Sequence, residues 1–210
     1  MNSRSMVASI CLCCLLGCSK GGSTNKEPAP TSKASWDSIP SMMLGPFRVY
    51  EKTEDFGGGM EHKLYLGGKN IAPPKLFYTH YRALDIILSN TEKYLLLNDS
   101  PATKANIVVL VNLDSWRQKN VGEVALKAYR NKRNLDPRLW ILPEGKSFSP
   151  DDRCVLVEIV LHYISTSEAA SANELAMQFE KSWYLIDAEN ASVVAELTEA
   201  PPWSNDARRD

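Results

Sequence analysis

The chain has 210 residues, of which 44% are hydrophobic, and 24 lysines and arginines against 25 aspartates and glutamates give it a formal net charge of −1. Non-specific binding of nucleic acid needs a basic face, so this nearly neutral balance argues against a nucleic-acid partner. The chain is long enough to bury a core that needs neither disulfides nor a metal for stability.

The first 17 residues have the pattern of an export signal. Arg4 precedes an apolar run from Met6 to Leu16, which only Ser9 interrupts. The run is too short for a transmembrane helix, which needs about 20 apolar residues. It has the length of the apolar region of a secretory signal, and the small Gly17 suits a signal-peptidase site. An ordinary secretory signal and a buried N-terminal helix are the alternatives.

The segment Leu15-Leu16-Gly17-Cys18 resembles the lipobox of bacterial lipoproteins. The resemblance covers about the first 20 residues and implies cleavage between Gly17 and Cys18, with a diacylglycerol on the Cys18 thiol. Ser19 stands where lipoproteins of the inner membrane often carry Asp, which implies the outer membrane, with the protein facing the periplasm. Two or more acyl chains would make the anchor firm.

A tether and one domain are expected behind the anchor. Residues 18–40 are rich in small and polar residues and predict a flexible tether. Residues 41–202 predict a single β-rich domain, and residues 203–210 a disordered tail. Because residues 11–14 leave with the signal, Cys154 is the one cysteine expected beside Cys18. It is interpreted as a buried small hydrophobic residue, without a disulfide.

Strand patterns dominate this domain. Short runs rich in β-branched and aromatic residues, separated by polar turns, predict strands. They are Phe47–Glu51, Lys63–Leu66, Lys93–Leu97, Asn106–Leu113, Arg138–Leu142, Cys154–Tyr163, Trp183–Asp187 and Ser192–Leu197, of which the last two form a hairpin through residues 188–190.

Two stretches favour helices. Residues Gly122–Asn134 are rich in good helix formers, and Ser167–Met177 begins with serines that could cap a helix. Pro74–Leu88 fits a helix or a strand.

An internal repeat suggests the architecture. Ser89–Asn98 lines up with Ser149–Glu158 at a spacing of 60 residues, each a polar turn followed by an apolar strand. Residues 148–159 and 183–197 are similar to strands two to four of a β-propeller blade. A closed propeller needs at least four blades, of about 40 residues or more each, and only two or three longer units fit here. We therefore predict a mainly β fold with one or two helices, in which blade-like antiparallel sheets stack without closing into a ring. A β-sandwich is the alternative.

The residue types that commonly serve in catalysis or metal binding form no recognisable motif in this sequence. His62, His80 and His162 lack metal-ligand spacing, so no metal, cofactor or catalytic residue is assigned, and the three are interpreted as surface or half-buried structural histidines. A metal site assembled from residues distant in the sequence is the alternative. Residues 145–147 (GKS) resemble the end of a phosphate-binding loop, but Trp140 replaces the glycine that such a loop needs. Residues 143–146 are therefore predicted to be a turn. Glu158 is expected to point to solvent from an alternating strand.

The tryptophans offer the best candidate for partner binding. Trp116 and Arg117 lie in a polar loop, and exposed Trp and Arg are favoured interface anchors. Packing of Trp116 back onto the sheet is the alternative.

The sequence thus favours a lipid-anchored, non-catalytic binding protein of the bacterial envelope, with an inhibitor or immunity role as one version. An envelope hydrolase with a site assembled from scattered acids and histidines is an alternative. A structural component of an envelope complex is another.

Overall fold

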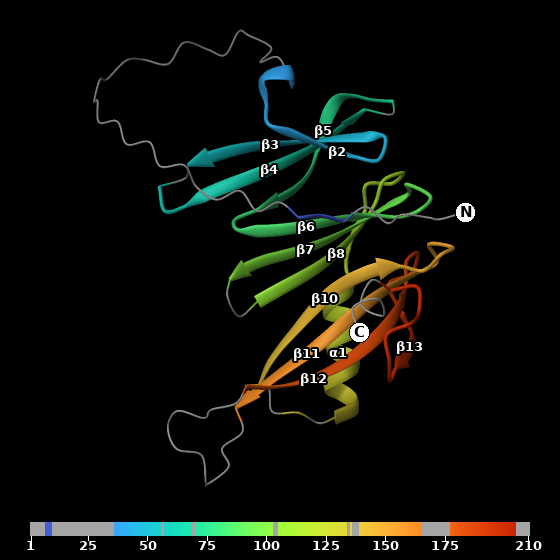
Figure 1. Ribbon diagram of the computed structural model, residues 1–210. Coiled ribbons are helices and arrows are strands. Elements are labelled where there is room, and N and C mark those ends of the chain that lie inside the picture. Colours follow the sequence, from blue (N-terminus) through green and yellow to red (C-terminus); the bar gives the residue numbers. More distant parts are fainter. Residues whose placement is uncertain are drawn as a thin grey trace.

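The structure is a computed structural model in which three antiparallel sheets are stacked one after another (Figure 1). It describes residues 7–9, 36–55, 57–68, 70–102, 105–133, 135, 139–164 and 177–204. The predicted fold class is confirmed, because the described chain is mainly β with one α-helix and its sheets do not close into a barrel. None of the described helices has the length and apolar character of a membrane span.

The first sheet is a meander of four strands that follow chain order. They are β2 (Ser41–Leu44), β3 (Phe47–Asp55), β4 (Met60–Gly68) and β5 (Ile71–His80). The ambiguity over residues 74–88 is resolved as strand, since β5 and the next strand cover nearly all of it. Strand β5 accommodates Pro73 and Pro74 because it lies at the edge of the sheet, where a proline without an N–H does not interrupt a ladder on both sides.

The second sheet lies in the middle of the stack. Its strands are β6 (Ala83–Leu88), β7 (Tyr94–Ala102), β8 (Ala105–Asn112) and β9 (Gln118–Asn120), with β1 (Val7–Ser9) paired beside β6. The third sheet consists of β10 (Trp140–Phe148), β11 (Cys154–Ile164), β12 (Met177–Asp187) and β13 (Val193–Leu197). Its last two strands form the predicted hairpin, and residues 188–192 connect them.

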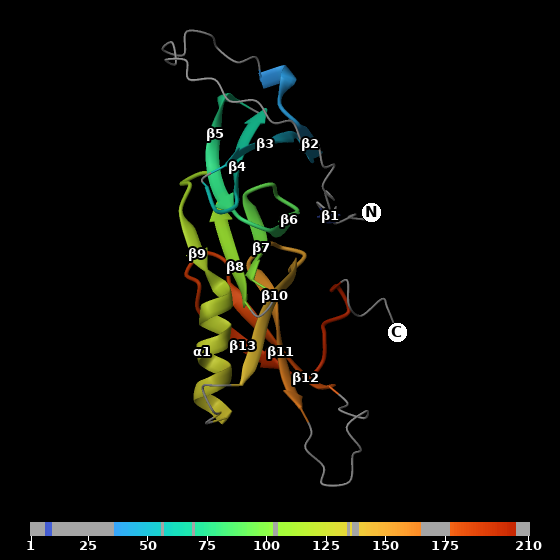
Figure 2. The same cartoon turned by 90° about the vertical axis from the view of Figure 1, so that its left-hand side faces the viewer.

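The helix predicted at Gly122–Asn134 is confirmed as α1 (Val121–Arg133). Asn120 caps it, because its side-chain oxygen accepts a hydrogen bond from the Glu123 amide at 2.9 Å. Its buried residues are Val121, Gly122, Ala125 and Tyr129, and it packs against the third sheet (Figure 2). Of the second predicted helix, residues 167–176 lie outside the described residues and Met177 belongs to β12.

The middle sheet buries both faces, which explains its uninterrupted apolar strands. On β7, Leu95 and Leu97 belong to a core shared with the first sheet, whereas Leu96 belongs to a core shared with α1 and the third sheet. On β8, Val109 and Val108 divide in the same way. Successive strand residues point to opposite faces, so a strand between two cores must be apolar at every position.

The repeat predicted from the sequence appears as two turns with the same hydrogen bonds. The Ser89 amide donates to the Tyr94 carbonyl at 3.0 Å, and the Ser149 amide donates to the Cys154 carbonyl at 2.9 Å. In each turn the fourth residue has a positive φ, 60° at Glu92 and 57° at Asp152. The two turns thus use one conformation to join the first two long strands of their sheets.

The second of these turns also binds the first. Asp152 is 4% exposed, and its carboxylate accepts hydrogen bonds from the Asn90 amide at 3.0 Å and the Thr91 amide at 2.5 Å. A carboxylate that accepts backbone N–H donors makes stronger bonds than a neutral acceptor. The middle and third sheets are therefore joined by a polar contact at the end of their shared core.

A close approach of backbone to side chains forms a second link between the same sheets. The Asn98 side chain donates to the Gly145 carbonyl at 2.8 Å and accepts from the Gly145 amide at 2.7 Å. A Cβ atom on Gly145 would lie 2.7 Å from a methyl carbon of Leu96. The prediction of a turn at residues 143–146 is wrong, because this segment lies within β10. Pro143 is tolerated in β10 because that strand is at the edge of its sheet.

The packed structure extends slightly beyond the predicted domain at both ends. Trp36, which falls in the predicted tether, lies in a short 3₁₀ helix (Trp36–Ser38) and contacts Tyr50 and Tyr65 with ring centroids 5.2 and 5.1 Å away. At the other end, Ser204 is fully buried. Aromatic packing orders the Trp36 segment although its composition resembles that of the tether.

Candidate functional site

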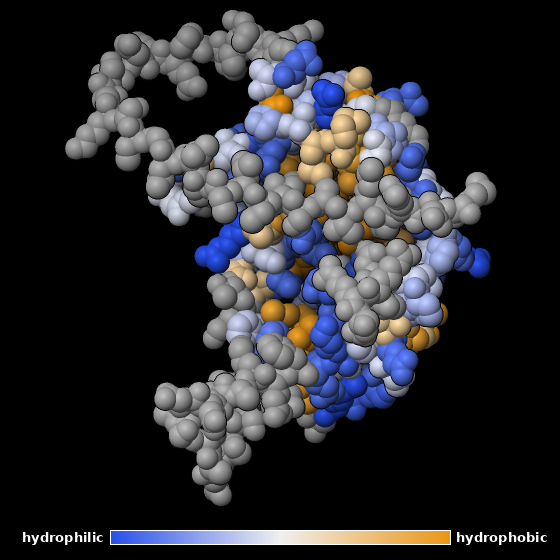
Figure 3. Space-filling view, viewed as in Figure 1, coloured by the Kyte–Doolittle hydropathy of each residue, from blue (hydrophilic) through white to orange (hydrophobic). Residues whose placement is uncertain are grey.

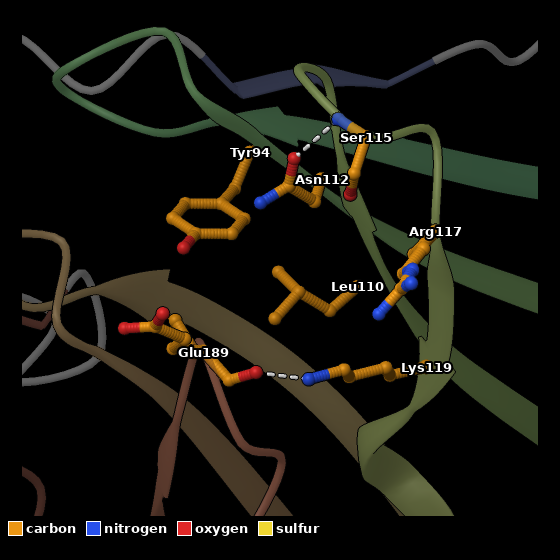
Figure 4. Close-up of a pocket in the computed structure, with 8 residues that line it drawn as sticks. Tyr94, Leu110, Asn112, Ser115, Arg117, Lys119 and Glu189 are labelled. Atoms are coloured by element: carbon orange, nitrogen blue, oxygen red, sulfur yellow. Dashed lines mark hydrogen bonds between the residues drawn. The ribbon is translucent and has the colours of Figure 1, made fainter.

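A small pocket lies where the loop between β8 and β9 faces the hairpin between β12 and β13 (Figure 4). Its volume is about 170 Å³. The residues that line it are Tyr94, Leu110, Asn112, Ser115, Arg117, Lys119, Ala188 and Glu189. The pocket therefore joins two sheets and includes one of the two residues predicted for partner binding.

The side chain of Asn112 determines the shape of the loop. Its oxygen accepts hydrogen bonds from the amides of Asp114 at 3.0 Å and Ser115 at 2.9 Å. The Trp116 amide donates to the Asn112 carbonyl at 2.7 Å, and Trp116 has a φ of 59°. Such an Asx turn, followed by a residue in the left-handed region, reverses the chain tightly.

The reversal sends the two predicted residues in different directions. Trp116 is half-buried against the core between the first two sheets, and the Lys75 ammonium lies 4.1 Å from its ring centroid. Arg117 is exposed at the pocket, and its guanidinium makes no hydrogen bond or ion pair with the residues that the structure describes. Trp116 is thus a packing residue, as the alternative reading had it, and Arg117 is available for contact.

The opposite wall carries the acidic group of the pocket. The Lys119 ammonium donates a hydrogen bond to the Glu189 carbonyl, which ties the two walls together. Figure 4 shows Arg117 and Lys119 on one side, and Tyr94 and Glu189 on the other. The eight lining residues include no histidine and no cysteine. Their chemistry suits recognition of a polar or carboxylate-bearing group.

Two of the three histidines lie side by side, although the sequence does not space them as metal ligands. His62 on β4 is directly opposite His80 on β5, and their ring centroids are 4.9 Å apart. Glu51 on β3 joins them, with its carboxylate 2.5 Å from Nδ1 of His62. His162 stays apart and stacks on Trp140 with ring centroids 4.8 Å away. Sequence spacing could not reveal the pair, because strand register brings the two histidines together.

Glu158 points inward, contrary to the prediction. Its side chain is 1% exposed and lies 2.8 Å from the ammonium groups of both Lys146 and Lys181. Burial by itself would raise the pKa of Glu158, but the two lysines hold that pKa below its ordinary value. Lys146, from the segment that resembles a phosphate-binding loop, is thus engaged with Glu158.

The cysteine predictions have different outcomes. Cys154 is half-buried, and burial raises the pKa of its thiol, which therefore stays protonated at neutral pH. Gly17 and Cys18, the predicted cleavage and lipidation site, lie outside the described residues.

No family model and no curated protein matches the chain. Among solved structures, the acylaminoacyl peptidase of Pyrococcus horikoshii, in an orthorhombic crystal form, is similar at a TM-score of 0.43 and 11% sequence identity. The similarity covers 78% of this chain and 25% of that chain, so this chain spans about a quarter of the peptidase. A likeness at this level carries no argument about function.

Proposed function

We propose that the chain is a lipoprotein of the bacterial envelope whose folded part holds a protein partner without catalysing a reaction. The N-terminal pattern ending at Cys18 supports the anchor. One structural feature agrees with it. Cleavage before Cys18 would remove β1, and the middle sheet would then be a meander of four strands, like the other two sheets.

The observation that carries the binding role is the exposed guanidinium of Arg117, which has no side-chain partner within the described part of the chain. An arginine presents five donors in a planar fork, which suits a carboxylate in two-point contact. The Asx turn at Asn112 fixes the loop before a partner arrives, so little chain entropy is lost on binding. A partner that offers an acidic side chain or chain terminus fits this corner of the pocket.

Glu189 adds a condition on the partner. Glu189 lines the pocket on the side opposite Arg117 (Figure 4), so the pocket residues carry charges of both signs. A peptide segment that carries both an acidic and a basic or hydrogen-donating group matches both walls. Pairing of opposite charges across an interface contributes mainly to specificity and to the rate of association.

The anchor is tested by expressing the chain and its Cys18→Ala variant in a bacterial host. The parent chain should fractionate with membranes, and mass spectrometry should find a lipidated N-terminal cysteine. The variant should lose the lipid and either keep its signal or appear in soluble fractions. An intact, unmodified N-terminus on the parent chain would overturn the anchor.

The binding role is tested by affinity capture from envelope extracts with the parent chain and with Arg117→Glu. Arg48→Glu is the matched control, since Arg48 is exposed on the first sheet, away from the pocket. The parent and the control should retain a stoichiometric partner, and Arg117→Glu should lose it. Equal recovery by all three proteins, or no recovery by the folded parent, would refute the role of this pocket.

A further inference from the structure

Three potential metal ligands converge on the first sheet, at its end near β6. Glu51 comes from β3, His62 from β4 and His80 from the last position of β5. One ligand atom of each residue lies within 4.8 Å of the others. His62 pairs with His80 on β5 and, across its other edge, with Thr53 on β3. Glu51 lies two positions before Thr53 on β3, so its side chain is on the same face of the sheet as the two histidines.

The hydrogen bonding of His80 leaves one nitrogen with a free lone pair. Its Nδ1 is 2.8 Å from the Arg82 carbonyl, which can only accept, so Nδ1 carries the proton. Nε2 of a neutral imidazole is then unprotonated. His80 is 4% exposed, and its Nε2 has no hydrogen-bond partner among the described residues. A buried acceptor without a partner destabilises the fold unless a ligand satisfies it.

The Arg82 carbonyl acts on His80 as the partners of metal-bound histidines do. Such histidines almost always donate their second ring N–H to a carbonyl or carboxylate, which fixes the tautomer and orients the ring. The buried histidine therefore has the tautomer and the orientation of a metal ligand.

The other two groups supply charge and an approach from solvent. The Glu51 and His62 side chains are 19% and 25% exposed, so a cation can reach them from outside. Nδ1 of His62 lies 2.5 Å from the Glu51 carboxylate and 3.4 Å from the Thr53 hydroxyl. Two imidazoles and one carboxylate form a donor set that suits Zn²⁺ and related divalent transition metals rather than Ca²⁺ or Mg²⁺.

We propose that Glu51, His62 and His80 form a binding site for a Zn²⁺-class divalent cation. Bonds of about 2.1 Å in a tetrahedral site place ligand atoms about 3.4 Å from one another. The ligand atoms of the three residues are separated by 2.5 Å in the Glu51–His62 pair and by at most 4.8 Å in the others. Side-chain rotation that moves them by about 1 to 1.4 Å would bring these separations to the tetrahedral value. The fourth position is taken by water or by a group from outside the chain.

Asp99 lies beside this site and would benefit from the cation. It is 5% exposed, accepts a hydrogen bond from the Tyr78 hydroxyl at 2.9 Å, and has one carboxylate oxygen without a partner among the described residues. Burial raises the pKa of Asp99, although the hydrogen bond from Tyr78 acts in the opposite direction. A bound dication would stabilise this carboxylate as an outer neighbour.

The test is a calorimetric titration of the full chain with Zn²⁺ alone, after chelation and after alkylation of the thiols, which removes competing cysteine ligands. The parent should bind one equivalent. His80→Gln and His62→Gln should each lower the affinity by more than about 100-fold, because removal of a direct ligand costs at least as much as loss of an outer partner. Glu51→Gln should also weaken binding, because the carboxylate is a proposed ligand. His162→Gln is the matched control and should bind as the parent does.

Cobalt provides a second readout that does not depend on calorimetry. Co²⁺ bound to the parent should give visible d–d absorption of a nitrogen–oxygen site, and the band should disappear in His62→Gln. Thermal unfolding without metal should be similar for the parent and His62→Gln, since His62 is partly exposed, which separates loss of ligand from loss of fold. Absence of a one-equivalent site, or equal weakening by His162→Gln, would overturn the proposal.

Discussion

Asp152 is expected to be a main contributor to the joint between the middle and third sheets. Its buried carboxylate accepts from two backbone amides and from the Asn90 side chain, the last at 3.0 Å. Hydrogen bonds to a charged group contribute about 1.5–3 kcal/mol each. Because Asn90 and Thr91 are exposed, water can replace the carboxylate as their hydrogen-bond partner, which reduces the cost of losing these bonds. Asp152→Asn keeps the shape and tolerates the positive φ, but removes the charge and points an amide at these donors. We expect it to lower the free energy of unfolding by about 2 kcal/mol.

The measurement is urea unfolding at neutral pH, followed by tryptophan fluorescence. A loss of about 2 kcal/mol corresponds to a fall of roughly 4–8 °C in Tm for a domain of this size. Asp151→Asn is the control, because Asp151 is exposed and bonds Ser149 and Arg153 of its own turn. Equal stability of Asp152→Asn and the control, within about 0.5 kcal/mol, would refute the proposed joint.

Two further outcomes follow from buried groups of the third sheet. Because Lys146 and Lys181 hold the pKa of Glu158 below its unfolded value of 4.5, the stabilisation is present above pH 4.5 and is lost as pH falls through the lower folded pKa. Glu158→Gln should therefore cost about 3 kcal/mol at pH 7 and flatten the acid limb of a stability–pH curve, and an unchanged curve would contradict the ion-pair geometry. Gly145→Ala should cost about 1–3 kcal/mol in urea unfolding, because its Cβ would lie 2.7 Å from Leu96, and a neutral result would contradict the close packing of the sheets.

Most of the strands could be predicted, because their side-chain patterns directly reflect burial. The run Lys93–Leu97 is apolar over four successive positions because β7 lies between two cores. The repeated turns were recognisable because a serine five residues before the strand accepts backbone hydrogen bonds in both, as Ser89 does from the Tyr94 amide at 3.1 Å and Ser149 from the Cys154 amide at 3.0 Å. Local chemistry is sufficient for such elements.

Predictions failed where a long-range neighbour overrides the local signal. The turn expected at residues 143–146 is a strand because Gly145 packs against Leu96 of another sheet. Glu158 is buried, although charged residues usually face solvent, because two lysines pair with it. Neither the packing partner nor the lysine pair is adjacent in sequence, so no local pattern announces them.

The amino-acid sequence by itself determined the β character, the positions of most strands, the helix after Asn120 and the repeated turn, since each depends on residues within one or two turns of chain. Only the tertiary structure decided that His62 and His80 meet beside Glu51, and that Trp116 packs inward while Arg117 faces a pocket. Those arrangements depend on strand register and on the stacking of sheets, which bring together residues that are far apart in the sequence.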